Sequence, residues 1–192
     1  LVAVDVNLFP AGFNNLSTES LSKGAAELKN FFESRLGSQS TWKIGLLPES
    51  HTNNEAYLRN VQTLSGMIQA AGAELKIAWT GMPIPKAWEL KVNSADNVSK
   101  SSIVYTPANE VTEWADALVL NHDLSGGLLD FIKNYPKPIF PSPELGWYKR
   151  KKSEHFDIAK KVLTRISQKV DIDGGDFLAE AITVGDLNFE NK

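Results

Sequence analysis

The sequence predicts a Rossmann-like α/β fold, which is an open and mostly parallel sheet with helices on both faces. Short β-branched or aliphatic runs alternate along the chain with segments of helical period. Alternation at this spacing is typical of parallel strands joined by right-handed crossovers. The chain has 192 residues, of which 42% are hydrophobic, and this is enough apolar material for one domain with a core of its own.

In the first half of the chain, hydrophobic periodicity predicts three strands and two helices. Five apolar residues share one face of the first helix: Leu21, Ala25, Leu28, Phe32 and Leu36. Gly37 and Gly72 end the two helices, and Pro48 ends the second strand. The expected elements are a strand over residues 1–6, a helix over 18–36, a strand over 42–47, a helix over 53–71 and a strand over 73–79.

In the second half, the predicted strands are shorter and one stretch has no clear period. Residues 81–101 are rich in Pro, Asn and Ser, which predicts an irregular connection. We expect residues 1–170 to form the Rossmann-like domain, and residues 171–192 to be a C-terminal extension or the start of a missing segment. The other expected elements are strands over 102–105, 117–120 and 138–140 and helices over 125–134 and 153–168.

The composition excludes several classes of protein. Lys and Arg number 20 against 23 Asp and Glu, and the pI is near 5.7, so a nucleic-acid-binding protein with a basic stripe is not expected. No apolar run approaches the roughly 20 residues that span a bilayer, and no signal sequence opens the chain. Cysteine is absent, which excludes disulfides and a cysteine nucleophile. A cytoplasmic protein is expected.

Polar clusters follow four of the predicted strands, at the point where each strand ends. In sheets of this kind, ligands bind beyond the carboxyl ends of the strands, and these ends share one edge when the strands are parallel. We therefore expect the clusters to converge on one binding site. The candidate substrate-binding residues are Asp5, Asn7, Gly12, Asn14 and Asn15 in the first cluster, Glu49, His51 and Asn53 in the second, Asn121, His122, Asp123 and Ser125 in the third, and Trp147 and Arg150 in the fourth.

Each cluster also has an interpretation that needs no ligand. The first could be a turn-rich connection, because Asn and Asp favour turns. Thr52 or Asn53 could cap one helix, and Asp123 or Ser125 the next. The basic run at 149–152 could be a solvated surface, or could hold a phosphate or carboxylate at a helix N-terminus.

Local motifs for a metal, a phosphate loop or a nucleophile are not found. The three histidines, His51, His122 and His155, have no metal-ligand spacing, so no metal site is predicted. Gly126 and Gly127 lack the Gly-Lys-Ser/Thr ending of a Walker loop. A Gly-x-Ser-x-Gly elbow for a Ser-His-Asp triad does not occur either.

Taken together, four segments in order resemble the N-terminal half of the proteobacterial-type glutamate–cysteine ligase. Over roughly residues 1–157 the resemblance is much more specific than any single motif, and beyond that it fades. The segments are VDVNLFPAGFNN at 4–15, LPESHTN at 47–53, LNHDLSGG at 120–127 and LGWYKRKKSEHF at 145–156.

The resemblance implies a ligase that forms γ-glutamylcysteine from glutamate, cysteine and ATP with Mg²⁺, in the first step of glutathione synthesis. In this family an acyl phosphate forms on the γ-carboxyl of glutamate and the cysteine amine attacks it. The architecture implied is similar to that of ATP-grasp ligases. Asn side chains of the first cluster could then bond amino or carboxyl groups, Arg150 could clamp a carboxylate, and Asp5, Glu49 or Asp123 could accept an ammonium.

The ATP-grasp portion of such an enzyme is not found in these residues. The chain is therefore expected to be a truncated fragment or a stand-alone relative that works with a separate subunit. In either case we expect it to bind no ATP or Mg²⁺ and to have no ligase activity alone. Two alternatives remain open: a non-catalytic Rossmann-like module that binds a small ligand or docks onto a subunit, and an unrelated α/β group transferase.

Overall fold

The protein is described by a computed structural model covering residues 9, 11–49, 55–79, 88–92, 101–149 and 152–170. The expected strand over residues 1–6 and the expected extension at 171–192 lie outside the described residues. Among the helices described, none is long and apolar enough to cross a membrane.

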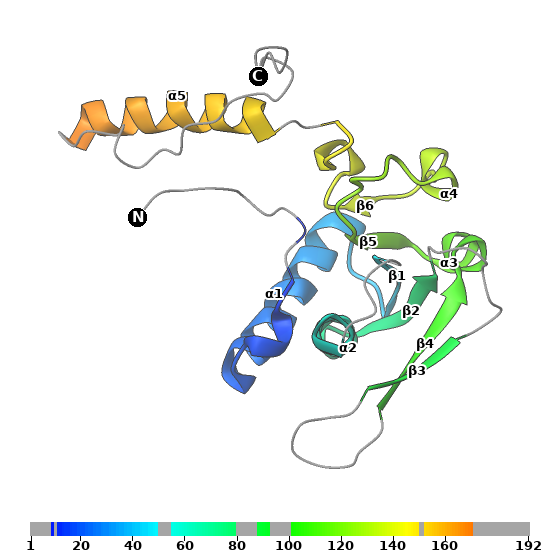
Figure 1. Ribbon diagram of the computed structural model, residues 1–192. Helices are drawn as coiled ribbons and strands as arrows, with labels where there is room; N and C mark the ends of the chain where they lie inside the picture. Colours follow the sequence, from blue (N-terminus) through cyan, green and yellow to red (C-terminus); the bar gives the residue numbers. More distant parts are fainter. Residues whose placement is uncertain are drawn as a thin grey trace.

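The core of the fold is a six-stranded sheet in the order β3-β4-β2-β1-β5-β6 (Figure 1). Neighbouring strands run parallel except for β3, which pairs with β4 in the antiparallel direction. The prediction of an open, mostly parallel sheet is therefore confirmed. The strands are β1 Trp42–Pro48, β2 Ala73–Trp79, β3 Trp88–Val92, β4 Ser101–Pro107, β5 Ala117–Asn121 and β6 Ile139–Phe140.

Helices cover both faces of the sheet. α1 (Thr18–Leu36) and α2 (Glu55–Ala70) lie on one face, and α3 (Ala108–Trp114) and α4 (Asp130–Lys133) lie on the other. Two 3₁₀ turns, η1 (Phe13–Asn15) and η2 (Pro143–Leu145), stand in the loops, and α5 (Lys152–Val170) ends the described part of the chain.

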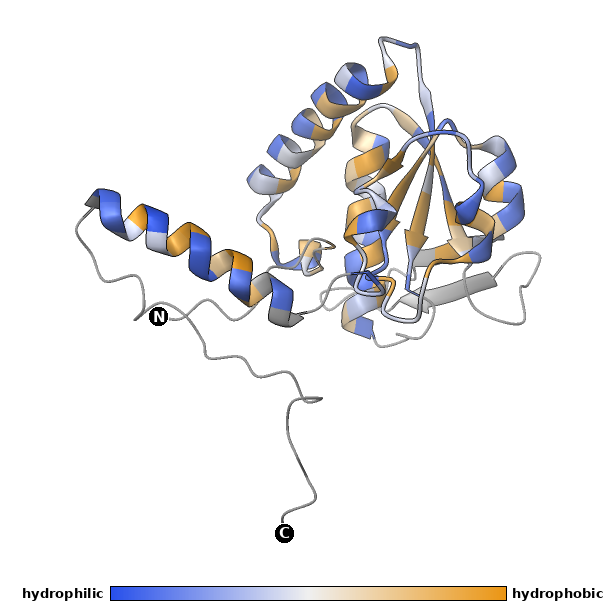
Figure 2. Cartoon of the chain, turned by 90° about the horizontal axis from the view of Figure 1, so that it is seen from above, coloured by the Kyte–Doolittle hydropathy of each residue, from blue (hydrophilic) through white to orange (hydrophobic). Residues whose placement is uncertain are grey.

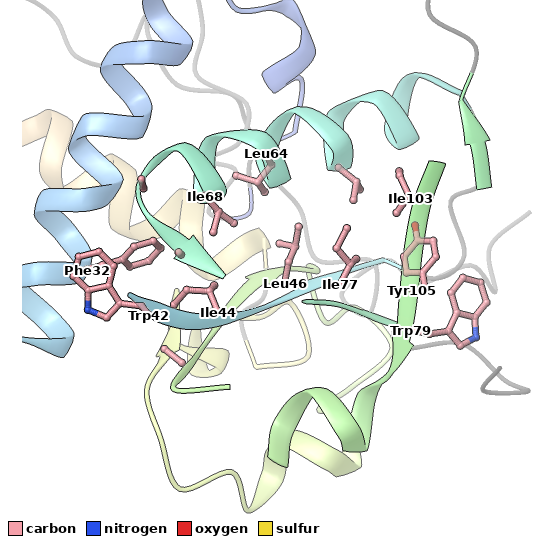
Figure 3. Close-up of a cluster of buried hydrophobic side chains, with 14 of the residues drawn as sticks. Phe32, Trp42, Ile44, Leu46, Leu64, Ile68, Ile77, Trp79, Ile103 and Tyr105 are labelled. Atoms are coloured by element: carbon pink, nitrogen blue, oxygen red, sulfur yellow. The ribbon is translucent and has the colours of Figure 1, made fainter. Parts of the chain in front are cut away.

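Two buried clusters hold these layers together, one on each face of the sheet. Side chains alternate between the faces of a strand with a period of two, so Leu46 joins the cluster below α2 while Leu47 joins the one below α3 and α4. Figure 3 shows Leu64 and Ile68 of α2 pointing toward the sheet residues Leu46 and Ile77. This burial of apolar area is the main force that fixes the helices on the sheet.

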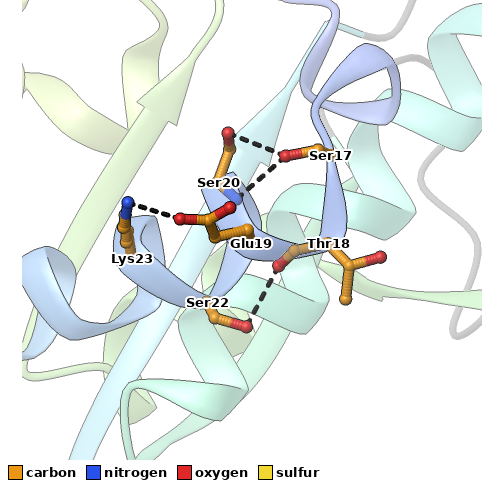
Figure 4. A network of polar contacts seen from close by, with 6 residues as sticks. All are labelled: Ser17, Thr18, Glu19, Ser20, Ser22 and Lys23. Carbon is orange, nitrogen blue, oxygen red and sulfur yellow. Dashed lines mark hydrogen bonds and ion pairs between the residues drawn. The ribbon is translucent and has the colours of Figure 1, made fainter.

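The start of α1 is set by local polar contacts (Figure 4). The Ser17 hydroxyl accepts a hydrogen bond from the backbone N–H of Ser20, with 3.2 Å between the two atoms, which satisfies one of the free N–H groups of the first turn. Glu19 and Lys23 form an exposed ion pair at 2.7 Å, and such surface pairs contribute little. The predicted helix over 18–36 is confirmed, and Gly37 is its C-cap with a φ of 80°.

Two predicted segments are wrong. Residues 81–101 are not irregular throughout, because Trp88–Val92 forms the edge strand β3, paired with β4 from Trp88 against Tyr105 to Val92 against Ser101. The predicted helix over 125–134 is confined to α4, Asp130–Lys133. Gly126 and Gly127 explain the shortening, since glycine disfavours helix and Gly127 has a φ of 107°. The sequence interpretation also missed α3.

The strand order places a topological switch point between β1 and β5. The connection after β1 runs through α2 to β2 on one side, and the connection after β5 runs through α4 to β6 on the other. The loops that leave these two neighbouring strands therefore diverge. In open α/β sheets, a crevice opens at this position beyond the carboxyl ends of the strands.

Candidate functional site

A pocket of about 230 Å³ lies at the carboxyl edge of the sheet, at the switch point between β1 and β5. It contains two carboxylates, one amide and three aromatic side chains. Its lining residues are Phe9, Ala11, Glu49, Tyr57, Asn121, Asp123 and Trp147.

Tyr57, in the first turns of α2, joins the ends of the two strands that border the pocket. Its hydroxyl accepts a hydrogen bond from the backbone N–H of Glu49 at 2.7 Å and donates one to the carbonyl oxygen of Asn121 at 3.3 Å. Burial raises the pKa of Tyr57 well above its ordinary value, and the nearby Glu49 carboxylate adds to the rise. The hydroxyl therefore stays protonated into the alkaline range and remains able to donate.

Asn60, one turn further along α2, fixes the loop that forms the opposite wall. This side chain is 1% exposed, and its Oδ1 accepts hydrogen bonds from the backbone N–H groups of Gly12 at 2.7 Å and Phe13 at 3.0 Å. Gly12 has a φ of 89°, a left-handed conformation that glycine adopts without strain. The amide of Asn60 thus holds the loop that carries Ala11 against α2.

The loop after β5 is shaped by its own side chains. The Nδ1 of His122, which is 7% exposed, accepts a hydrogen bond from the Leu124 backbone N–H at 2.9 Å. Leu124 has a φ of 57°, a left-handed conformation that is uncommon for a residue other than glycine. The Oδ1 of Asp123 accepts a hydrogen bond from the Ser125 backbone N–H at 2.9 Å. These contacts keep Asp123 at the rim of the pocket.

The loop after β6 packs onto the loop after β5. The backbone N–H of Trp147 donates a hydrogen bond to the Asp123 carbonyl oxygen at 2.9 Å. A Cβ atom at Gly146 would lie 2.8 Å from the Cβ of Leu124, so only glycine permits this approach. The close contact brings the indole of Trp147 into the pocket beside Asp123.

The structure brings four of the fourteen candidate residues into the pocket lining: Glu49, Asn121, Asp123 and Trp147. Four others lie in the adjoining loops without lining it: Gly12, Asn14, Asn15 and Ser125. Among these, Asn14 donates to Asn15 at the exposed surface, with 3.3 Å between Nδ2 and Oδ1. His122 is buried within its loop. The remaining five lie outside the described residues: Asp5, Asn7, His51, Asn53 and Arg150.

The capping interpretation of the third cluster is wrong. The N-cap of α4 is Leu129, without a side-chain cap, so neither Asp123 nor Ser125 caps that helix. The bond from Ser125 to Asp123 instead closes a turn within the loop. The alternative in which Thr52 or Asn53 caps α2 lies outside the described residues.

Sequence reasoning missed Tyr57 and Asn60, and it left Phe9 and Ala11 out of the candidate site. A signal for Asn60 exists, because it is a lone amide on the apolar face of α2 beside Leu58 and Val61. Buried amides are retained where they satisfy buried backbone groups. No comparable signal marks Tyr57, since a tyrosine near a helix start is an ordinary core residue.

The chemistry of the pocket does not fit ATP. Within the described part of the chain its lining has two carboxylates and no Lys or Arg, whereas triphosphate sites use cations and backbone N–H groups. Lys149 forms an ion pair with Glu144 outside the pocket. Over the same described residues, no group of three or more His, Asp or Glu side chains could hold a metal ion. The pocket suits a positively charged group of a small molecule, which carboxylates and aromatic faces bind well.

A pocket at the switch point of a doubly wound sheet is typical of α/β proteins that bind small molecules. Comparison with known proteins gives the family. The sequence matches the glutamate–cysteine ligase family over residues 1–192, and the chain belongs to this family.

A solved structure agrees with this assignment. It is the 1.90 Å crystal structure of a protein from Methylobacillus flagellatus KT assigned as a gamma-glutamylcysteine synthetase, and it is 32% identical with a TM-score of 0.74. The match covers 89% of this chain and 40% of that chain, so the chain spans less than half the length of this relative. No curated protein matches the sequence.

Proposed function

We propose that this chain supplies an amino-acid pocket of a glutamate–cysteine ligase, the enzyme that joins the γ-carboxyl of glutamate to the amine of cysteine with ATP through an acyl phosphate. The observation that carries the proposal is the acidic pocket at the switch point, with Glu49 and Asp123 on facing loops. Family membership indicates that the substrate is an amino acid, and the two carboxylates of the pocket indicate that its ammonium group is bound there.

The α-ammonium group that glutamate and cysteine share is the part of the substrate that this pocket suits. Two carboxylates attract an ammonium and accept its hydrogen bonds, and charge-assisted bonds of this type are the strong ones. The rings of Tyr57 and Trp147 border the same space and can cover the apolar part of the substrate. Tyr57, Asn60 and His122 already hold the described residues Glu49, Gly12 and Leu124 in place, which lowers the entropic cost of binding.

ATP and Mg²⁺ are assigned to a part of the ligase outside the described residues. The acidic pocket repels phosphates, and the described residues offer no metal cluster. What this chain does in the reaction is therefore to bind and orient an amino acid, a contribution through positioning. We expect no ATP-dependent formation of γ-glutamylcysteine by the purified 192-residue chain, and detection of that product would contradict this assignment.

Titration calorimetry with glutamate and with cysteine, each added alone, tests the pocket. We expect Glu49→Gln and Asp123→Asn each to weaken amino-acid binding about tenfold, the loss of one charge-assisted contact. Glu113→Gln makes the same chemical change on the exposed surface of α3 and should leave binding unchanged. The absence of heat with both amino acids, or equal losses in all three variants, would refute the proposal.

The poor fit of the pocket lining to ATP also favours a second function, that of a non-catalytic binding module. A non-catalytic module that binds an amino acid and docks onto a separate subunit would show the same pocket. Such a module would bind the amino acid, but it would not support product formation when joined to the rest of a ligase. Membership of the ligase family removes the third interpretation, an unrelated group transferase.

A further inference from the structure

The helix α5 exposes a stripe of large apolar side chains. Ile158, Val162 and Ile166 are 61%, 47% and 49% exposed, and their spacing of four residues places them on one side of the helix. Thr164 and Gln168 are exposed on the opposite side. We name the three apolar residues the α5 face.

Within the described part of the chain, no other element packs extensively against α5. Figures 1 and 2 show the helix standing apart from the sheet, with hydrophobic and hydrophilic residues alternating along it. A single helix in water gains most of its stability from packing its apolar side, and contiguous exposed apolar residues mark interaction surfaces. The α5 face is therefore suited to a partner.

We propose that the α5 face docks the portion of the glutamate–cysteine ligase that lies outside the match to this chain. The proposal rests on the proposed function. The match covers only 40% of the solved relative, so more than half of such a ligase lies outside the matched portion and is a candidate to cover its exposed apolar surface. Among the described α-helices, α5 is the one that carries large hydrophobic side chains exposed to solvent.

The position of α5 favours this occupant. The loop over 143–149 leads into α5, and Trp147 of the same loop lines the pocket. A partner seated on α5 is therefore linked to the pocket through this one short loop, which suits a portion of the ligase that works together with the amino-acid site.

The charges beside the α5 face define the expected partner surface. Lys161 and Arg165 are exposed and, by helical spacing, border the apolar stripe along one side. The complementary surface is apolar in its centre and carries carboxylates along one rim, as ordinary protein interfaces do.

Thiol labelling tests the proposal cleanly because the chain contains no cysteine. Val162→Cys reports on the α5 face and Thr164→Cys on the opposite side. Each is made in the 192-residue chain and in a fusion in which the chain replaces the matched portion of the Methylobacillus flagellatus protein. Maleimide labelling of each position is followed by peptide mass spectrometry.

We expect both positions to label rapidly in the 192-residue chain. In the fusion, labelling at 162 should slow about tenfold or more, while labelling at 164 should change less than about twofold. Fast labelling at 162 in the fusion overturns the proposal. Slow labelling at 162 in the 192-residue chain, with dimers in sedimentation, assigns the face to a second copy and also overturns it.

A pair of matched double variants gives a second readout. Ile158→Glu with Val162→Glu should lower the melting temperature of the fusion by several degrees and leave that of the 192-residue chain unchanged. Thr164→Glu with Gln168→Glu adds the same charge and should change neither. Equal changes in melting temperature in the two proteins overturn the proposal. It is also overturned if the 192-residue chain binds phosphatidylserine vesicles and the Ile158→Glu, Val162→Glu variant does not, because the face would then bind a membrane.

The docking proposal and the proposed function fail separately. Labelling and melting need no catalysis, so a fusion that protects position 162 without forming γ-glutamylcysteine supports docking alone. Loss of amino-acid binding in calorimetry counts against the pocket and leaves the α5 face untouched.

Discussion

The two edges of the sheet use similar polar residues for different purposes. At the amino edge, Asp116 closes the start of β1: its backbone N–H donates to the carbonyl of Lys43 at 2.7 Å, and its Oδ2 accepts from the N–H of Lys43 at 2.9 Å. The Thr41 hydroxyl likewise donates to the Gly72 carbonyl at 2.9 Å. Side chains at this edge pair directly with the strand ends.

At the carboxyl edge, polar side chains hold loops around a hollow. Tyr57 and Asn60 tie neighbouring loops in place, and Glu49 and Asp123 line the space between them. The connections diverge at this edge because β1 and β5 lead in opposite directions across the sheet. The comparison teaches that polar side chains in this fold pair with the strand ends where connections close on the strands, and line a pocket where the connections part.

The largest expected effect comes from removing the amide that holds the pocket wall. Asn60→Leu leaves two backbone N–H groups, of Gly12 and Phe13, without their acceptor and should cost about 3 kcal/mol of folding stability, measured by urea unfolding. Gln69→Leu makes the same change on an exposed part of α2 and should cost less than about 0.5 kcal/mol. A loss below 1 kcal/mol for Asn60→Leu, on the scale of typical mutations, would mean that the loop is held in another way.

The second-largest effect is expected from disturbing the contact between the loops after β5 and β6. Gly146→Ala drives a methyl group against Leu124 and should destabilise the protein by about 2 kcal/mol, with weaker amino-acid binding because Trp147 moves. Gly66→Ala is a matched control inside α2, where nothing lies within 4 Å, and it should stabilise the protein by about 0.5–1 kcal/mol. Thermal unfolding and calorimetry measure both variants, and a neutral Gly146→Ala would contradict the tight packing.

Replacing one carboxylate at each edge of the sheet should change folding stability at the amino edge and amino-acid binding at the carboxyl edge. Asp116→Asn removes the charge that assists the bond to Lys43 and should lower stability by about 1 kcal/mol without changing affinity for an amino acid. Asp123→Asn keeps an oxygen acceptor for Ser125 and should do the reverse, weakening binding with little loss of stability. If both variants lose affinity equally, the contrast between the edges is wrong.

The smallest effect at neutral pH concerns two tyrosines, one at each edge. Burial raises the pKa of Tyr135, whose hydroxyl donates to the Ala115 carbonyl at 3.0 Å, from 10.0 to about 12, and burial raises the pKa of Tyr57 as well. The unfolded chain ionises first, near pH 10, so the folded state binds more protons above that pH. Stability should therefore be constant up to about pH 10 and fall between about 10 and 12.

Matched phenylalanine variants separate the two tyrosines. Tyr57→Phe and Tyr135→Phe should each flatten the alkaline loss, measured by urea unfolding at successive pH values. At neutral pH only Tyr57→Phe should weaken amino-acid binding, because its hydroxyl joins Glu49 to Asn121. An unchanged alkaline profile in both variants would show that other groups control it.

Local pattern was sufficient for most of the secondary structure. The helix Thr18–Leu36 and the strand Ala73–Trp79 have the predicted bounds, since each combines a clear period with a terminal glycine or a flanking break. The pattern failed where context decides. Trp88–Val92 becomes a strand only because β4 offers an edge to pair with. Residues 125–129 lack a helix because Gly126 and Gly127 disfavour one.

The sequence by itself determined the α/β class, the order of most elements and the polar residues that follow four of the predicted strands, because these depend on local period and composition. Its likeness to glutamate–cysteine ligases rests on four motifs that occur in the same order. Only the tertiary structure decided which of those residues share a pocket. That outcome depends on the strand order, which places β1 beside β5 although their paired positions Gly45 and Leu118 are 73 positions apart in the chain. It depends also on Tyr57 and Asn60, whose side chains hydrogen-bond to residues of separate loops. Long-range pairing of this kind is set by burial of the whole core, and no local pattern records it.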